Sequence, residues 1–162
     1  MACIIIGRFQ PLHKGHVSLI KQALNNHDSV TVIVCNAKDP ARNPFSTEER
    51  VRMIRENFGK NVKVMSVNDI GDDIEWYSLI RENAGVFDVV YSGNDWVRDI
   101  FESHGHTVLE PPAEFNCSAT LVRKLMNEDG DWKSWLTPET VKVIEDIKGV
   151  ERVKSIFKNQ NQ

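Results

Sequence analysis

The most constraining feature of this chain is a short apolar run, followed at once by a glycine and then by a helical pattern. Residues 3–6 are apolar and contain β-branched isoleucines, which favour a buried parallel strand. Gly7 ends that run, and Val17, Ile20 and Leu24 then recur at helical spacing. The segment predicts a strand, a tight turn and a helix that begins near residues 12–14, with the turn delivering its side chains to the helix N-terminus.

The turn reads G-R-F-Q-P-L-H-K-G-H over residues 7–16. A helix N-terminus has unpaired N–H groups and the positive end of the helix dipole, so it favours an anion such as phosphate. His13 and His16 lie three residues apart and share one helix face, where imidazolium groups and the guanidinium of Arg8 could hold phosphate oxygens. Gly15 leaves room for a nucleotide ring to come close. The residues therefore indicate nucleotide chemistry.

Other interpretations of the two histidines stay open on the residues alone. A histidine pair at one-turn spacing can be part of a metal site, although no third ligand stands nearby in the sequence. Either histidine can also be an ordinary surface or core residue. The position of the pair between a strand and a helix favours a functional role.

Composition narrows the class of protein. The chain has 162 residues and a formal net charge of −3, which fit a single domain and do not suggest a nucleic-acid coat protein. Cys3, Cys35 and Cys117 are odd in number and scattered, which favours reduced thiols. We see no signal peptide and no apolar run long enough to cross a membrane. We expect a soluble, cytoplasmic protein with no nucleic-acid or membrane partner.

Apolar β-branched runs alternate with helical patterns along the chain, which predicts an α/β fold with a parallel sheet. If the sheet is doubly wound with its first and fourth strands adjacent, a crevice opens at their carboxyl ends, where Gly7 and the segment 92–94 would meet. The strands are expected at residues 3–6, 30–35, 62–67, 86–92 and 107–109. The helices are expected at residues 14–26, 47–57, 74–83, 95–103, 119–126, 138–147 and 150–157.

Three local signals refine this pattern. Ser46 and Glu49 have capping-box spacing, which predicts a helix beginning there. Gly149 lies between the last two helical patterns and predicts a helix stop. Ser118 or Thr120 could cap a helix whose N–H groups receive phosphates. We interpret residues 1–162 as one domain, with a C-terminal helical part at about 118–158.

The turn resembles the H-x-G-H signature of the nucleotidyltransferase superfamily. The full sequence of residues 7–16 closely resembles that of the archaeal-type nicotinamide mononucleotide (NMN) adenylyltransferases. Further similar pieces follow in the family's order and cover nearly the whole chain. They are N-P-F with E-R over residues 43–50, Trp76 after an acidic loop, S-G-N at 92–94, S-x-T-x-x-R at 118–123, and a C-terminal region from G-D-W at 130–132 to G-V-E-R at 149–152.

The resemblance implies a Rossmann-like nucleotidyltransferase fold, a doubly wound parallel sheet with C-terminal helices. It also implies an enzyme that joins ATP and NMN to give NAD and pyrophosphate. The catalytic residues it implies are Arg8, His13, His16 and Arg123. The ATP-binding residues it implies are Gly7, Phe9, Gln10, Gly15, Ser92, Gly93, Asn94, Ser118 and Thr120.

For NMN, the resemblance implies binding by Arg42, Asp69, Asp73 and Trp76. The Trp76 ring could stack on the planar, cationic nicotinamide, although a core tryptophan is the competing explanation. Mg²⁺ is expected to bind through the substrate phosphates, with no metal ligand from the protein. The resemblance also suggests a homo-oligomer. The apolar Ile156 and Phe157 are candidate contacts for it, and they could equally pack on the sheet of their own chain.

Two alternatives to this function remain. One is an enzyme of the same superfamily with another acceptor, such as flavin mononucleotide or phosphopantetheine. The other is a non-catalytic module that senses nucleotides. The order of Trp76, the S-G-N segment and the C-terminal region argues against the first, and the presence of both histidines and Arg123 argues against the second.

Overall fold

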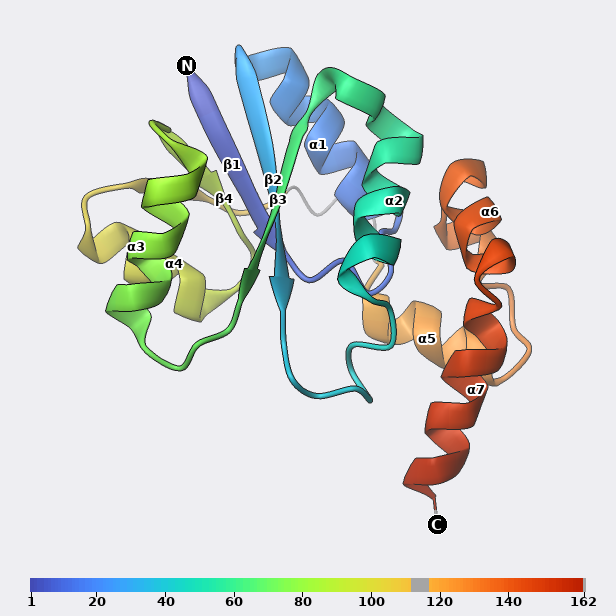
Figure 1. Ribbon diagram of the computed structural model, residues 1–162. Coiled ribbons are helices and arrows are strands. Elements are labelled where there is room, and N and C mark those ends of the chain that lie inside the picture. The colour runs from blue at the N-terminus through green and yellow to red at the C-terminus, as the bar shows by residue number, and fades with distance from the viewer. Residues whose placement is uncertain (112–116, 162) are drawn as a thin grey trace.

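The computed structural model describes residues 1–111 and 117–161 and is built on a five-stranded parallel sheet (Figure 1). Its order is β3-β2-β1-β4-β5, and every neighbouring pair is parallel. The strands are β1 (Ala2–Gly7), β2 (Ser29–Asn36), β3 (Lys63–Asn68), β4 (Val89–Tyr91) and β5 (Thr107–Leu109). The expected adjacency of the first and fourth strands is confirmed, so the winding reverses beside β1 and opens a crevice at the carboxyl ends.

Helices cover both faces of the sheet (Figure 1). The first face carries α1 (Lys14–Asn26) and α2 (Thr47–Phe58), and the second carries α3 (Asp73–Ala84) and α4 (Asp95–Ser103). Successive side chains of a strand point to opposite faces. Accordingly, Cys3 and Ile5 belong to the core under α1 and α2, whereas Ile4 and Ile6 belong to the core under α3 and α4.

Three further helices extend the first face. They are α5 (Ala119–Asn127), α6 (Pro138–Asp146) and α7 (Gly149–Gln160), and they lie beside α2, with the end of α7 projecting from the body (Figure 1). Val122, Val143 and Val153, one from each helix, are buried in the same core as α1 and α2. The C-terminal helices therefore continue the core of the sheet. Short 3₁₀ turns at Gly59–Asn61 and Lys133–Trp135 complete the described elements.

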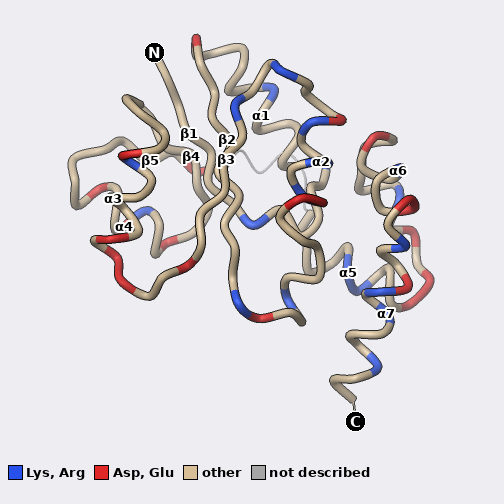
Figure 2. Tube along the Cα trace, viewed as in Figure 1, with Lys and Arg blue, Asp and Glu red and all other residues tan. Residues whose placement is uncertain are grey.

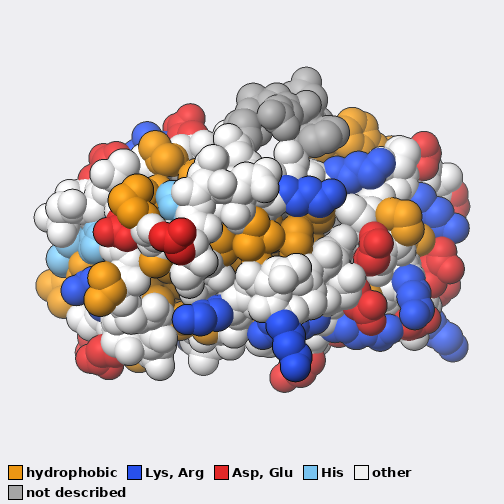
Figure 3. Space-filling view, turned by 90° about the horizontal axis from the view of Figure 1, so that it is seen from above, with side chains coloured by type: hydrophobic (Ala, Val, Ile, Leu, Met, Phe, Trp, Pro, Cys, Tyr) orange, Lys and Arg blue, Asp and Glu red, His pale blue; other side chains and the backbone are white. Residues whose placement is uncertain are grey.

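Charged residues are distributed unevenly. Acidic and basic side chains are mixed on the face seen from above (Figure 3), which fits the net charge of −3. Basic residues of the β2–α2 loop and of α5, in contrast, lie at the edge where the strands end (Figure 2). Positive charge is thus available at the end of the sheet where the crevice opens. No helix in the described part of the chain combines the length and the apolar character needed to cross a bilayer.

Most predicted elements are confirmed to within a few residues. Ser46 caps α2, because its Oγ accepts the N–H of Glu49 at 3.1 Å and a Glu49 carboxylate oxygen accepts the N–H of Ser46 at 2.8 Å. The strand expected at 86–92 is shorter, since only Val89–Tyr91 pairs with both neighbours and Val86 is 83% exposed.

The prediction that Gly149 stops a helix is wrong. Lys148 takes the left-handed conformation between the last two helices, with φ +54° and ψ +47°, and Gly149 is the first residue of α7. A Cβ on Gly149 would lie 3.0 Å from Cε1 of Phe45 and 3.2 Å from Cγ2 of Ile144. The glycine is there because α7 begins in close contact with the core, a tertiary reason that local sequence does not reveal.

We predict that Gly149→Val lowers the free energy of unfolding by about 1–3 kcal/mol, because the added atoms overpack the contact with Phe45 and Ile144. Denaturant unfolding measures this change. Ser155→Val, at an exposed position of the same helix, is the matched control and should change the stability little. Equal effects of the two substitutions would contradict the packing argument.

Candidate active site

The turn between β1 and α1 is buried and tightly packed. Phe9 is 2% exposed and has a left-handed φ of +53°. Its ring atom Cζ lies 2.9 Å from where a Cβ on Gly7 would be, so the ring occupies the space that a side chain at Gly7 would need. The Phe9 ring also meets the His16 ring edge-on, with centroids 4.9 Å apart. Gly7 and Phe9 therefore shape the turn and support His16.

His13 and His16 cap α1 reciprocally. Nδ1 of His13 accepts the backbone N–H groups of Gly15 at 3.1 Å and His16 at 3.4 Å, and Nδ1 of His16 accepts the N–H of His13 at 3.1 Å. The two rings stack with centroids 3.6 Å apart. Because both Nδ1 atoms are acceptors, each neutral ring carries its proton on Nε2. The pair can therefore offer two Nε2–H donors to a ligand.

The structure corrects one expectation for this pair. Burial lowers the pKa of His13 to about 4, and burial together with the neighbouring His13 holds the pKa of His16 well below its ordinary value. The rings are thus neutral donors in the free protein, not the imidazolium groups that we expected. Gly15 makes room for the His13 ring, whose Cε1 is 2.9 Å from a Cβ position on Gly15, and its contact with a nucleotide stays a prediction.

Positive charge in the site comes from arginines. The cavity beside the histidines has a volume of about 760 Å³, and three guanidinium groups line it. They belong to Arg8, Arg42 and Arg123. Arg123 is 8% exposed and donates to the carbonyl oxygen of Gln10 at 2.8 Å, whereas the side chain of Arg42 is 76% exposed. The buried guanidinium is fixed in place, whereas the exposed one forms only a long ion pair, with Nε 3.8 Å from Oδ2 of Asp39.

The start of α5 lines the same cavity. Ser118 is its N-cap, with Oγ accepting the N–H of Leu121 at 3.1 Å, so the predicted cap is Ser118. Thr120 instead lies in the first turn, where its Oγ1 accepts from Arg123 at 3.5 Å. Both residues line the cavity. A helix N-terminus beside Arg123 gives this wall a positive potential that suits phosphate.

A second cavity, of about 540 Å³, lies at the carboxyl ends of β1 and β4. The predicted residues Ser92, Gly93 and Asn94 line it, together with Asp69. Asn94 caps α4, with its side-chain oxygen accepting two N–H groups of the first turn, and Ser92 Oγ accepts the N–H of Asn94 at 3.1 Å. The two cavities adjoin at four residues that line both of them. These residues are Arg8, Phe9, His16 and Arg42.

Trp76 and Asp73 line neither of these two cavities. Trp76 is 1% exposed in the core, and its ring packs against that of Trp96 with centroids 4.6 Å apart. Asp73 Oδ1 accepts the indole N–H of Trp96 at 3.0 Å. The face of Trp76 that we expected to stack on nicotinamide is therefore packed inside the protein. Trp96, which is 41% exposed and lines the second cavity, was missed; its position two residues after Asn94 was the available signal.

Gln10 is engaged within the protein. Its side-chain amide donates to the carbonyl oxygen of Phe45 at 3.0 Å and accepts the N–H of Phe45 at 2.9 Å. Both polar groups of the side chain are thus used to hold the turn against the β2–α2 loop. Gln10 lines the first cavity while its amide holds this turn, and its contact with ATP stays a prediction.

Comparisons with known proteins point to one family. A family described as cytidylyltransferase-like matches residues 4–125. Curated nicotinamide-nucleotide adenylyltransferases are similar over nearly the full length. The protein from Methanolobus tindarius is 37% identical over 95% of this chain and 93% of its own length, and that from Methanococcus aeolicus is 34% identical over 96% and 95%. The chain belongs to the archaeal-type nicotinamide-nucleotide adenylyltransferases.

A solved structure supports the fold of this adenylyltransferase. A bifunctional NMN adenylyltransferase/ADP ribose pyrophosphatase from Francisella tularensis, complexed with AMP and a manganese ion, matches with a TM-score of 0.81. Its identity is 20%, and the match covers 99% of this chain and 52% of that one. At this identity, the similarity shows the Rossmann-like α/β fold alone.

The described residues contain no group of three or more His, Cys, Asp or Glu side chains that could hold a metal ion. The first cavity is lined by guanidinium and imidazole groups. The oxygens of a bound polyphosphate are good ligands for Mg²⁺. The expectation that Mg²⁺ enters with the substrate stays a prediction.

The low pKa of His13 predicts a pH-dependent stability. An unfolded histidine binds a proton near pH 6.5, whereas native His13 binds it only near pH 4. The contribution of His13 to the free energy of unfolding should be fully present above pH 6.5. It should be lost as the pH is lowered toward 4, by up to about 3 kcal/mol. His13→Asn keeps a capping acceptor and removes the titration, so its free energy of unfolding should fall less between pH 7 and pH 4.5. Equal losses in the two proteins would contradict the assignment.

Proposed function

We propose that this adenylyltransferase joins ATP and NMN to give NAD and pyrophosphate. The observation that carries the proposal is the pair of cavities that adjoin at Arg8, His16 and Arg42. Two phosphate-bearing substrates in adjoining cavities meet at these groups, which can bind and bring together both phosphates. The names of the similar curated proteins support the same reaction.

We assign the triphosphate of ATP to the first cavity. The start of α5 and the buried Arg123 face this space, and both favour phosphate. We assign NMN to the second cavity, with its phosphate at Arg42 and its ring beside Trp96. Ser92, Gly93 and Asn94 were predicted for ATP, but they line the second cavity and are therefore reassigned here to the nucleoside that enters it.

The reaction requires no covalent intermediate. A phosphate oxygen of NMN attacks the α-phosphorus of ATP, a new P–O–P bond forms, and the bond to the β-phosphate breaks as pyrophosphate leaves with the electron pair. The nucleophile is already an anion at neutral pH, so no general base is needed. The protein supplies in-line positioning and stabilisation of the charge that builds on the transferring and leaving groups.

Each residue of the site has a distinct part in this reaction. Arg8 and Arg42 offset the repulsion between the two substrates' phosphates at the junction of the cavities. His13 and His16 donate Nε2–H to phosphate oxygens as neutral groups. Arg123, beside the N-terminus of α5, binds the leaving pyrophosphate. A bound divalent ion, for which we propose Mg²⁺, would screen the charge of the triphosphate.

Two further expectations from the sequence stay predictions. The first is the cytoplasmic location. The second is the homo-oligomer, for which Ile156 and Phe157 were candidate contacts. Phe157 is partly buried against the core and lines the first cavity, which gives its apolar side chain a role within one chain. Light scattering tests the oligomeric state directly.

We predict pyrophosphate release with ATP, Mg²⁺ and NMN, and none with flavin mononucleotide or phosphopantetheine. His16→Ala should lower the rate by about 10²- to 10³-fold, the usual effect of removing one donor to a transition state. His104→Ala, a histidine that lines neither of the two cavities, should leave the rate unchanged. Pyrophosphate release with another acceptor would support the site but assign a different substrate. Binding of ATP without pyrophosphate release from any acceptor would favour a module that senses nucleotides.

The position of Trp96 yields a second prediction. Trp96→Ala should raise the KM for NMN by about tenfold, consistent with the loss of about 1.4 kcal/mol of ring contact, and leave the KM for ATP nearly unchanged. Trp76→Phe should lower the free energy of unfolding and leave both KM values nearly unchanged, because Trp76 is in the core. A higher KM for NMN in Trp76→Phe alone would restore our original assignment of the stacking residue.

A further inference from the structure

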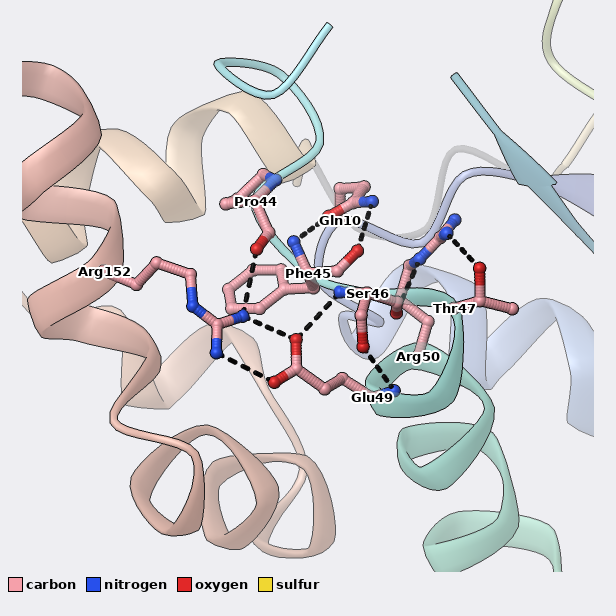
Figure 4. Close-up of polar contacts among 8 residues, drawn as sticks. All are labelled: Gln10, Pro44, Phe45, Ser46, Thr47, Glu49, Arg50 and Arg152. Carbon is pink, nitrogen blue, oxygen red and sulfur yellow. Dashed lines mark hydrogen bonds and ion pairs between the residues drawn. The ribbon is translucent and has the colours of Figure 1, made fainter. Parts of the chain in front are cut away.

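Two sequence motifs have no part in the reaction described above, namely the E-R pair at 49–50 and the G-V-E-R segment at 149–152. The structure joins them. Arg152 of α7 donates Nη1 to one carboxylate oxygen of Glu49 at 2.5 Å and Nη2 to the other at 2.9 Å (Figure 4). The same Nη1 donates to the carbonyl oxygen of Pro44 at 3.0 Å. A bidentate ion pair thus connects residues 103 positions apart.

This ion pair is stronger than an ordinary surface pair. The side chains of Glu49 and Arg152 are 16% and 37% exposed, and both N–H donors are aligned on the carboxylate. Burial alone would raise the pKa of Glu49, but the hydrogen bonds from Arg152 and Ser46 outweigh it and lower that pKa. Its carboxylate oxygen also accepts the N–H of Ser46 at 2.8 Å. The pair therefore clamps the turn at residues 44–46.

The 44–46 turn is also hydrogen-bonded to the phosphate-binding segment between β1 and α1. Phe45 lies between Pro44 and Ser46, and its backbone exchanges two hydrogen bonds with the amide of Gln10 (Figure 4). The carbonyl oxygen of Gln10 accepts from Arg123 at 2.8 Å. A continuous path of hydrogen bonds therefore runs from α7 through this turn to a guanidinium in the first cavity.

The same clamp sets a wall of the cavity. Phe157 and Gln160, in the second half of α7, line the first cavity together with Arg123. Arg152 precedes them by five and eight residues on one rigid helix. Holding the start of α7 against the 44–46 turn thus fixes the distance between this wall and Arg123.

We propose that Glu49 and Arg152 are positioning residues for adenylyl transfer. They act through Phe45 and Gln10 on Arg123, and they keep α7 in place as a wall of the triphosphate cavity. The inference rests on the proposed function. Misplacing Arg123 weakens its contact with the leaving pyrophosphate mainly in the transition state, so a loss of the clamp lowers kcat more than it raises KM.

The chain contains a matched control for a merely structural role. Arg52 and Asp146 form a second ion pair between α2 and the C-terminal helices, with Nη2 and Oδ2 2.5 Å apart and exposures of 39% and 44%. Arg52 also pairs with Glu56 on its own helix. This pair joins α2 to α6, and within the described residues its two side chains bond to each other and to Glu56 but not to the 44–46 turn. Both pairs attach α2 to the C-terminal helices, Arg52–Asp146 to α6 and Glu49–Arg152 to α7. Of the two, Glu49–Arg152 is the one bonded to the 44–46 turn that holds Gln10.

The experiment compares Arg152→Met, Glu49→Gln, Arg152→Lys and the control Arg52→Met. We would measure kcat, both KM values and the free energy of unfolding, at a temperature where every variant is folded by circular dichroism. Arg152→Met should lower kcat by about 10- to 100-fold, as a displacement of about 1 Å at a catalytic group does, with the KM for NMN changed less than about twofold. Glu49→Gln should lower kcat less.

Arg152→Lys should recover the stability and only part of kcat, because a lysine keeps the charge but cannot bond both carboxylate oxygens and Pro44 in one plane. Arg52→Met should lose a similar stability with unchanged kcat. If Arg152→Met and Arg52→Met lose equal stability and both keep full kcat, the inference is overturned.

A readout independent of turnover separates this inference from the proposed function. The Nε–H resonance of Arg123, followed by nuclear magnetic resonance, should shift in Arg152→Met and stay in place in Arg52→Met. An unaltered protein that shows no turnover with any acceptor would overturn the proposed reaction, and the resonance would still report on the clamp. An unmoved Arg123 resonance in Arg152→Met would overturn the positioning role.

Discussion

The active site depends on side chains that hold the backbone between β1 and α1, because much of that segment lies outside the strand ladder and the helix. Arg50 supplies the central contact. Its buried guanidinium donates to the carbonyl oxygens of Arg8 at 2.9 Å, Cys35 at 2.8 Å and Ser46 at 3.1 Å (Figure 4 shows the bond to Ser46). One side chain thus ties the ends of β1 and β2 to the start of α2. Together with the amide of Gln10, it makes the phosphate-binding segment a fixed surface.

Holding the segment in this way has an energetic cost. Arg50 and Arg123 are 3% and 8% exposed, and neither belongs to an ion pair found among residues 1–111 and 117–161. Burial lowers the pKa of both groups. Carbonyl oxygens satisfy their N–H donors but do not neutralise their charge. Arg123 lines the first cavity. In the proposed function, the polyphosphate bound there would supply the missing negative charge and offset a cost already present in the free protein.

The sequence predicted the features of the fold that depend on short local patterns of residues. The apolar residues of β1 alternate between two cores, and the Ser46 cap depends on residues three positions apart, so both could be read from short segments. The burial of Trp76 could not, because the ring that packs against it comes from α4. Nor could the ion pair of Glu49 and Arg152, whose partners are 103 residues apart. The sequence-based predictions therefore fail or are missing where tertiary contacts decide the environment of a side chain.

The histidine pair illustrates why residue type alone does not give the chemical state of a site. Two imidazolium rings 3.6 Å apart would repel each other by about 4–5 kcal/mol at an effective dielectric constant of 20. The stack therefore disfavours a double charge. The capping bonds disfavour even a single one, because a proton on Nδ1 of either ring would displace a backbone N–H that this nitrogen accepts. In the free protein, His13 and His16 are thus N–H donors fixed in direction, and in the proposed reaction the arginines supply the charge that meets the phosphates.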